Sequence, residues 1–294
     1  MSNHATVSVV IPCYNGAHFL SKAIDSVLTQ TVAVDEILVV DDGSTDNTRE
    51  VAVSYGNRVT YIFQKNKGLA GARNTGIKAA KSDWVALLDA DDWWMPDKIE
   101  LQKRVVSDDT VLVYTGVWFV NSDGSSTQCP AASPNTLWPA LRTRNLITPS
   151  TVMIRKVSLT EIGGFNESIR ACEDWDMWVR LIPKGEFKAV VEPVTGYRVV
   201  SGSLSSDPYR MLNTFYAILD GTLLQGLKGL ERELWRRRAV STQLYSAALI
   251  AREANRRKDE LHLMAKSLAV WPSIFWQASR YRSFLFSLKR FLIQ

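Results

Sequence analysis

Two carboxylates separated by one residue directly follow a short apolar run in the first half of the chain. Asp89 and Asp91 come immediately after the apolar residues 85–88. Alternate carboxylates at a strand end can coordinate a divalent cation such as Mn²⁺ or Mg²⁺, whose other ligands are phosphate oxygens and water. The neighbouring Asp92 also fits an ordinary helix start, because the helix dipole favours acids there. The spacing alone leaves both interpretations open.

A second acidic pair begins a later helix. Glu173 and Asp174 are the first residues of the helical pattern over 173–182. A carboxylate within hydrogen-bond reach of a hydroxyl group can remove its proton while the oxygen attacks, which is general base catalysis. Acids at a helix start are favoured without any catalytic role. The pair alone therefore indicates a base only weakly.

Two further loops carry groups suited to a nucleotide. Asp42 follows the apolar run 37–40 and could accept hydrogen bonds from a base or a ribose, although Asp and Gly also favour plain turns. The glycine-spaced stretch 68–76 begins a helix and would place Lys67 and Arg73 near phosphate oxygens. Its competing interpretation is close packing of a helix on a sheet. It is not a P-loop, because the required lysine is absent.

These loops belong to an alternation of strands and helices. Strands are expected at 7–11, 37–40, 59–63, 85–88, 111–120, 187–191 and 194–200. Helices are expected at 18–28, 46–54, 69–80, 96–106 and 173–182. Alternation of this kind predicts an α/β fold, with parallel strands covered by helices on both faces. Because ligands bind outside the carboxyl ends of such strands, the polar loops should meet at one edge.

The remaining segments divide the chain. Residues 121–150 are rich in Ser, Thr, Asn and Pro and are expected to form a long loop or lid. The pattern becomes helical after residue 207, with a helical hairpin over 231–270. We therefore predict a large domain over 1–207 and a helical C-terminal region over 208–294. Three scattered cysteines without a CxxC pair favour neither a disulfide framework nor a zinc site.

The net charge of +5 is concentrated in basic residues of the last third. Residues 271–294 combine Trp and Phe with Arg and Lys, which fits an interfacial helix on anionic lipid. The alternative is that this helix docks on the larger domain or on a second copy, giving a homo-oligomer. No secretory signal or membrane-spanning run is visible, so we expect a cytoplasmic protein, peripheral on the inner face of the membrane. Nucleic acid is not an expected partner, because the converging carboxylates repel phosphate chains.

Taken in order, six motifs resemble those of the family 2 inverting glycosyltransferases with the A-type fold. They cover about residues 6–206 and read VSVVIPCYNG, ILVVDDGSTDNT, NKGLAGARNTG, VALLDADDWWMPDKIE, IGGFNESIRACEDWDMWVRL and YRVVSGSLS. The resemblance implies a Rossmann-like, mainly parallel sheet flanked by helices, with a C-terminal α-helical extension.

The resemblance also implies roles for single residues. The nucleotide pocket would be lined by Pro12, Tyr14 and Asn15, and Asp42 would bind uracil or the nearby ribose. Asp89 would hold the ribose side of the donor and Asp91 would ligate the metal. Asp174 would be the base, with Glu173 as the second candidate. Many relatives carry a His two residues after the Arg of the Tyr-Arg pair, whereas Val199 and Val200 follow that pair in this chain. The contribution of that His to metal or phosphate binding is therefore absent here, or it is taken by Ser203 or Ser205.

The implied activity is transfer of a sugar, with inversion, from a UDP-sugar to an acceptor hydroxyl. The acceptor would be a glycan or a lipid-linked glycan, in polysaccharide, glycolipid or cell-envelope glycan synthesis. The alternative is a catalytically inactive homologue that binds nucleotide or acts as a scaffold at a membrane surface.

Overall fold

The first four strands pair in parallel in the computed structural model, which describes residues 5–199, 207–272 and 274–292. They follow the spatial order β3-β2-β1-β4 and are β1 (Val7–Cys13), β2 (Glu36–Asp41), β3 (Thr60–Phe63) and β4 (Trp84–Leu87). Every residue of β1 and β4 is buried, as expected for central strands covered on both faces. The strand order reverses between β1 and β4, and this is where an open α/β sheet forms its binding crevice.

Beyond β4 the sheet becomes mixed. It continues through β8 (Met153–Arg155), β6 (Thr110–Val120), β9 (Glu186–Arg198) and β5 (Trp93–Trp94), and β7 (Ser126–Cys129) pairs with β6. The β6–β9 pair is parallel, whereas β4–β8, β6–β8, β6–β7 and β5–β9 are antiparallel. The predicted α/β class is confirmed, and the parallel character belongs mainly to the N-terminal half of the sheet.

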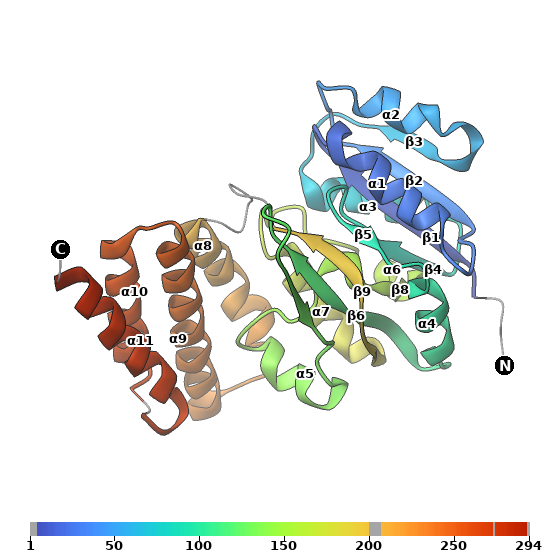
Figure 1. The fold of residues 1–294 in the computed structure, drawn as a ribbon. Coiled ribbons are helices and arrows are strands. Elements are labelled where there is room, and N and C mark those ends of the chain that lie inside the picture. The colour runs from blue at the N-terminus through green and yellow to red at the C-terminus, as the bar shows by residue number, and fades with distance from the viewer. Residues whose placement is uncertain (1–4, 200–206, 273, 293–294) are drawn as a thin grey trace. The chain divides into compact units, whose positions relative to one another are not determined.

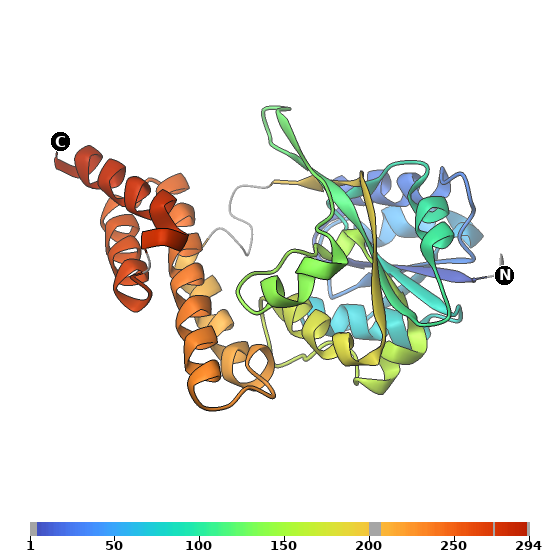
Figure 2. The ribbon, with the colours of Figure 1, turned by 90° about the horizontal axis from the view of Figure 1, so that it is seen from below.

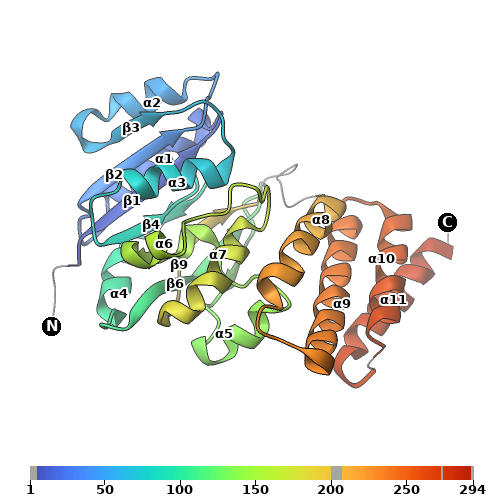
Figure 3. The same cartoon turned by 180° about the vertical axis from the view of Figure 1, so that it is seen from behind.

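Helices cover both faces of this sheet. Helix α1 (Ala17–Leu28) lies over one face of the parallel half, with α2 (Thr48–Ser54) beside it (Figure 1). Helix α3 (Leu69–Ala79) covers the opposite face, where α6 (Lys156–Glu161) and α7 (Glu173–Leu181) also lie (Figure 3). Helix α4 (Lys98–Val105) packs against β6 and β9.

The glycine-spaced helix start packs directly on the sheet. A Cβ atom at Gly76 would lie 2.3 Å from Val10 Cγ1, so only glycine allows α3 to approach β1 this closely. Close packing of a helix on the sheet, the competing interpretation of the glycine-spaced stretch 68–76, is therefore confirmed for Gly76.

Two predicted elements differ from the structure. The strands expected at 187–191 and 194–200 form the single strand β9, with register shifts opposite Thr115 and Gly116. A side chain at Gly116 would lie 2.8 Å from the Val191 carbonyl oxygen, so the bulge depends on this glycine.

The prediction of a long loop over 121–150 was wrong. The segment contains β7, helix α5 (Pro134–Leu141) and a short 3₁₀ turn (Pro149–Thr151). The reason is pairing that the composition does not reveal: β7 completes a hairpin with the end of β6. Figure 2 shows this hairpin extending away from the body of the sheet.

The chain divides into two compact units. Unit 1 comprises Met1–Leu137 and Leu146–Val200, and unit 2 comprises Trp138–Asn145 and Ser201–Gln294. The predicted domain limit at 207/208 stays a prediction. It adjoins residues 200–206, including Ser203 and Ser205, which lie outside the described residues.

Unit 2 is helical, as the pattern after residue 207 predicted. It contains α8 (Pro208–Ile218), α9 (Gly229–Glu253), α10 (Arg257–Val270) and α11 (Ile274–Leu292). Helices α9 and α10 lie side by side, which confirms the predicted hairpin (Figures 1 and 3). They approach closely where Ser241 and Ser267 each donate a hydrogen bond to the other's carbonyl oxygen, at 2.8 and 2.7 Å. None of the helices in the described ranges has both the length and the apolar character needed to cross a bilayer.

Candidate active site

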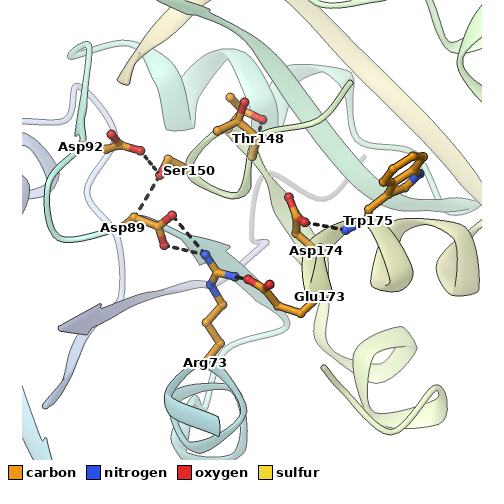
Figure 4. A network of polar contacts seen from close by, with 9 residues as sticks. Arg73, Asp89, Asp92, Thr148, Ser150, Glu173, Asp174 and Trp175 are labelled. Carbon is orange, nitrogen blue, oxygen red and sulfur yellow. Dashed lines mark hydrogen bonds and ion pairs between the residues drawn. The ribbon is translucent and has the colours of Figure 1, made fainter. Parts of the chain in front are cut away.

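A buried arginine connects two of the predicted acids. Arg73 lies in α3 with only 1% of its surface exposed. Its Nη1 is 2.6 Å from Glu173 Oε1, and its Nη2 is 2.8 and 3.1 Å from the two carboxylate oxygens of Asp89. Figure 4 shows the two acids facing the guanidinium from different sides. One cation therefore joins α3, the loop after β4 and the first turn of α7.

This pairing decides which acids remain available. Burial alone would lower the pKa of Arg73, but the carboxylates of Asp89 and Glu173 outweigh it and raise that pKa above its ordinary value. The guanidinium stays charged, and its single positive charge is shared by the two acids. Both of its terminal nitrogens are engaged by these carboxylates, and the predicted contact of Arg73 with phosphate stays a prediction. Glu173 is thus buried in an ion pair.

A second network fixes the turn that carries the alternate carboxylates. The buried Ser150 hydroxyl accepts a hydrogen bond from the Asp89 N–H (3.1 Å) and donates one to Asp92 Oδ2 (2.5 Å). The other oxygen of Asp92 accepts from the Arg198 N–H at 3.0 Å, and Arg198 Nε donates to the Asp91 carbonyl oxygen at 3.1 Å. The turn is thus tied to the 149–151 segment through Ser150 (Figure 4) and to the end of β9 through Arg198.

Asp91 lies between these two networks, and the positive charges of Arg198 and Arg73 act on it. Its side chain is partly buried, and among the described residues its carboxylate forms no ion pair. Burial, and then the negative charge of Asp89, raise the pKa of Asp91. A carboxylate destabilised in this way would gain from a bound cation.

The acids present fit a cation that is only partly coordinated by protein. Among the described residues, no three His, Cys, Asp or Glu side chains are grouped to form a complete metal site. Mg²⁺ and Mn²⁺ are commonly held by one or two carboxylates together with substrate phosphates. Asp91 matches that mode and does not match a metal site made entirely of protein ligands.

Asp174 lies in the first turn of α7, next to Glu173 but outside the Arg73 ion pair. The preceding Cys172 adopts a left-handed conformation with φ of 58°, which redirects the chain into the helix. One oxygen of Asp174 accepts a 2.7 Å hydrogen bond from the Trp175 N–H, and the side chain is partly exposed (Figure 4). The amide hydrogen bond orients the carboxylate while part of it remains accessible.

Acids from the β4 turn and from α7 all raise the pKa of one tyrosine, Tyr197. Burial raises the pKa of the Tyr197 phenol, and so do four nearby carboxylates, Asp92, Asp89, Asp91 and Asp174. Electrostatic effects of this kind require proximity. Asp91 and Asp174 therefore border the same region of unit 1.

The residues predicted to bind the nucleotide lie after β1, β2 and β3. Pro12 is buried in β1, whereas Tyr14 is 57% exposed. Asn15 has φ of 50°, and its Oδ1 accepts a hydrogen bond from the Thr45 N–H at 2.8 Å, which joins the loops after β1 and β2.

Asp42 organises the loop after β3. Its Oδ1 accepts from Gln64 Nε2 (2.6 Å) and from the Lys67 N–H (2.8 Å), and its Oδ2 accepts from the Gly68 N–H (2.8 Å). The Lys67 side chain is exposed. Asp42 thus joins the loop after β2 to the loop after β3, and Oδ2, which accepts a single bond, keeps the remaining acceptor capacity.

The sequence interpretation missed three residues of the site. Ser150 carried no local signal because it fell in a segment assigned to a loop. Asp92 was assigned to a helix start, and Arg198 was noted only as part of a motif. The four letters DADD at 89–92 are the one signal that a third acid follows the pair.

The comparisons with known proteins agree on one family. The model of glycosyl transferase family 2 matches residues 8–158, a range that includes Asp89 and Asp91 but not Asp174. An uncharacterized glycosyltransferase of Rickettsia prowazekii is 36% identical over 59% of this chain and 58% of its own length. One of Rickettsia typhi is 32% identical over 74% of this chain and 71% of its own. A chondroitin synthase of Pasteurella multocida is 38% identical over 62% of this chain, but only 19% of that protein is matched.

Solved structures share the fold at low identity. Residues 1–349 of S. aureus TarS in complex with UDP-GlcNAc superpose with a TM-score of 0.61 and 16% identity, covering 90% of this chain and 81% of that one. The mannosyltransferase PcManGT from Pyrobaculum calidifontis, in complex with GDP-Man and Mn²⁺, has a TM-score of 0.58 and 20% identity, covering 96% and 85%.

The electrostatics of Asp91 generate a prediction about stability. Because the folded-state pKa of Asp91 is raised, its charge costs stability above that pKa, and the cost disappears below the unfolded value of about 3.9. In EDTA at pH 7.5, Asp91→Asn should therefore raise the thermal midpoint, by about 2–4 °C. This gain should shrink as the pH falls to 4. Scanning calorimetry across this pH range measures it.

The exposed Asp108→Asn serves as the control and should change the midpoint little at any of these pH values. A midpoint for Asp91→Asn that is below that of the unmodified chain in EDTA at pH 7.5 would contradict the electrostatic description of this residue.

Proposed function

The chain belongs to glycosyl transferase family 2, and we propose that it transfers a sugar, with inversion, from a UDP-sugar to an acceptor hydroxyl. The observation that carries this proposal is the division among four neighbouring acids. Asp89 and Glu173 share the guanidinium of Arg73, whereas Asp91 and Asp174 lie outside that ion pair and both act electrostatically on Tyr197. One acid is thereby suited to a cation and the other to a proton.

Asp91 and a divalent cation, Mn²⁺ or Mg²⁺, would hold the donor diphosphate. When bound, such a cation supplies Lewis acidity that offsets negative charge on the phosphates. Asp89 is held by Arg73 and by the Ser150 hydroxyl, so its contribution is to position the turn and, through its partly exposed oxygens, to contact the ribose.

The nucleoside would lie against the loops after β1 and β2. The exposed Tyr14 and Asn15 offer a surface for the base, which Pro12, buried in β1, would border. Asp42 Oδ2 keeps an acceptor position for a base N–H or a ribose hydroxyl. The exposed Lys67 can reach a phosphate. Uridine is the nucleoside that we assign, from the resemblance of these motifs.

Asp174 would be the base. It takes the proton of the acceptor hydroxyl while that oxygen forms a bond to the anomeric carbon of the sugar. The bond from this carbon to the diphosphate oxygen breaks, and its electron pair leaves with the diphosphate. Since the entering and leaving oxygens lie on opposite sides of the carbon, a single displacement inverts the configuration. Glu173 is the less suitable base, because its carboxylate is buried and paired with the Arg73 guanidinium.

We assign the acceptor to a glycan or a lipid-linked glycan in polysaccharide, glycolipid or cell-envelope glycan synthesis. The name of the matched chondroitin synthase supports this assignment, although the match covers only about a fifth of that protein.

Peripheral contact with the inner face of the membrane is supported by α11. There Leu285 and Phe286 are 62% and 57% exposed, and Arg282 and Lys289 are exposed nearby.

Two substitutions separate the metal from the base. Asp91→Asn and Asp174→Asn should each lower transfer by about 10²–10⁴-fold. Only Asp91→Asn should also abolish the Mn²⁺-dependent thermal stabilisation by UDP, because Asp174 does not hold the donor. Release of UDP from a panel of UDP-sugars, combined with thermal shifts in UDP or GDP with and without Mn²⁺, measures both effects. Retained transfer in both variants would refute the assignment.

The membrane proposal has an independent test. Phe286→Ser should reduce co-sedimentation with phosphatidylglycerol vesicles several-fold, because it removes apolar surface that would be buried at the interface. Phe63→Ser is the matched control, since Phe63 is 62% exposed in unit 1. Equal sedimentation of both variants and the unmodified chain would dispose of contact through this helix, as would equal binding to neutral phosphatidylcholine vesicles.

A further inference from the structure

Tyr197 occupies a fixed position beside the β4 turn. The preceding Gly196 pairs with Trp93 of β5, where a side chain at Gly196 would lie 2.2 Å from the indole ring. The following Arg198 is hydrogen-bonded through its N–H to Asp92. The Tyr197 ring contacts Phe119 edge-on, with ring centroids 5.4 Å apart. Backbone and ring are thus held from both sides.

The hydroxyl group of Tyr197 has no assigned function in the fold. The side chain is partly exposed, and its hydroxyl makes no hydrogen bond to any residue in the described ranges. Its surroundings are nevertheless strongly polar, because four carboxylates act on it electrostatically. A phenol that is surrounded by negative charge keeps its proton and can therefore donate a hydrogen bond to a ligand oxygen.

The Tyr197 hydroxyl lies on the side of the site where the nucleotide-sugar would bind. The residues on both sides of Tyr197 are bonded to the β4 turn or to β5, which follows it. Gly196 pairs with Trp93, the Arg198 N–H donates to Asp92, and Arg198 Nε donates to the Asp91 carbonyl oxygen. None of these contacts involves α7, so Tyr197 is fixed beside the turn that carries Asp91.

On the basis of the proposed function, we propose that the Tyr197 hydroxyl donates a hydrogen bond to the β-phosphate of the donor nucleotide. When the bond between the anomeric carbon and the diphosphate breaks, its electron pair adds negative charge to this phosphate. A hydroxyl that donates a hydrogen bond to an oxygen of this phosphate then interacts with it more strongly in the transition state than in the ground state. This difference accelerates the reaction. The tyrosine keeps its proton throughout, and the acceptor proton goes to Asp174.

Tyr197→Phe tests this assignment, because it removes only the hydroxyl and keeps the ring on Phe119. We expect kcat to fall about 10- to 100-fold, with the acceptor KM unchanged. In the presence of Mn²⁺, the affinity for UDP should fall about tenfold. The affinity for UMP, which lacks the β-phosphate, should stay within about twofold of the unmodified chain.

Tyr55→Phe is the matched control. Its hydroxyl donates to Asp25 Oδ1 (2.9 Å) and to the Ser21 carbonyl oxygen (3.2 Å) of α1, outside the groups assigned to substrate. This variant should retain kcat and both nucleotide affinities, which shows that loss of a tyrosine hydroxyl alone is not the cause.

Three results would overturn the assignment. They are an unchanged kcat and UDP affinity in Tyr197→Phe, an equal loss of UDP and UMP affinity, and a change confined to the acceptor KM. The first means that the hydroxyl is idle, the second a structural effect, and the third a contact with the acceptor. If the unmodified chain bound no UDP and released none from UDP-sugars, the proposed function would fail, and the tyrosine assignment with it.

Discussion

The site depends on one buried ion pair network, in which Arg73 bonds to Asp89 and to Glu173. Three segments distant in sequence, namely α3, the loop after β4 and the first turn of α7, meet at this guanidinium. Removing one partner of a buried ion pair costs about 3–5 kcal/mol, because it leaves an uncompensated charge in a poorly solvated place. The position of α7 relative to the β4 turn, and with it the position of Asp174, is therefore set by electrostatics as much as by apolar packing.

The same network makes four neighbouring acids unequal. Arg73 pairs with two of them, and Asp92 is satisfied by a serine hydroxyl and a backbone amide. Burial and the neighbouring acids raise the pKa of Asp91 and, more strongly, that of Asp92, so the charged forms of both are disfavoured in the fold. The sequence places three acids within four residues, and their different hydrogen-bond partners distinguish them. Under the proposed function, the affinity of Asp91 for a cation and its cost in stability would have a common origin.

Much of the fold was predictable because it follows local patterns. The buried strands of the parallel half and the helices after residue 207 follow from apolar spacing, and the loops at strand ends follow from the rule that places ligands there. The sequence also indicated Asp91 and Asp174 as the acids of interest. What it did not indicate depends on long-range partners. The pairing of Arg73 with Asp89 and Glu173 was not predicted, because these acids lie 16 and 100 residues away.

Ser150 shows the same limit, since its hydroxyl bridges Asp89 and Asp92 from a segment whose composition resembles a loop. The segment Trp138–Asn145 is a further case: it belongs to unit 2, where Gln243 Nε2 donates to the Thr143 carbonyl oxygen at 2.7 Å.

The most direct test of the proposed site is a crystal structure with Mn²⁺, UDP and an acceptor fragment. The account predicts that Asp91 would hold Mn²⁺ together with the diphosphate, that Arg73 would still be paired with Asp89 and Glu173, and that the Asp174 carboxylate would contact the acceptor hydroxyl. A cation held by Asp92 instead, or an Asp174 side chain facing a different cavity from the nucleotide, would contradict it.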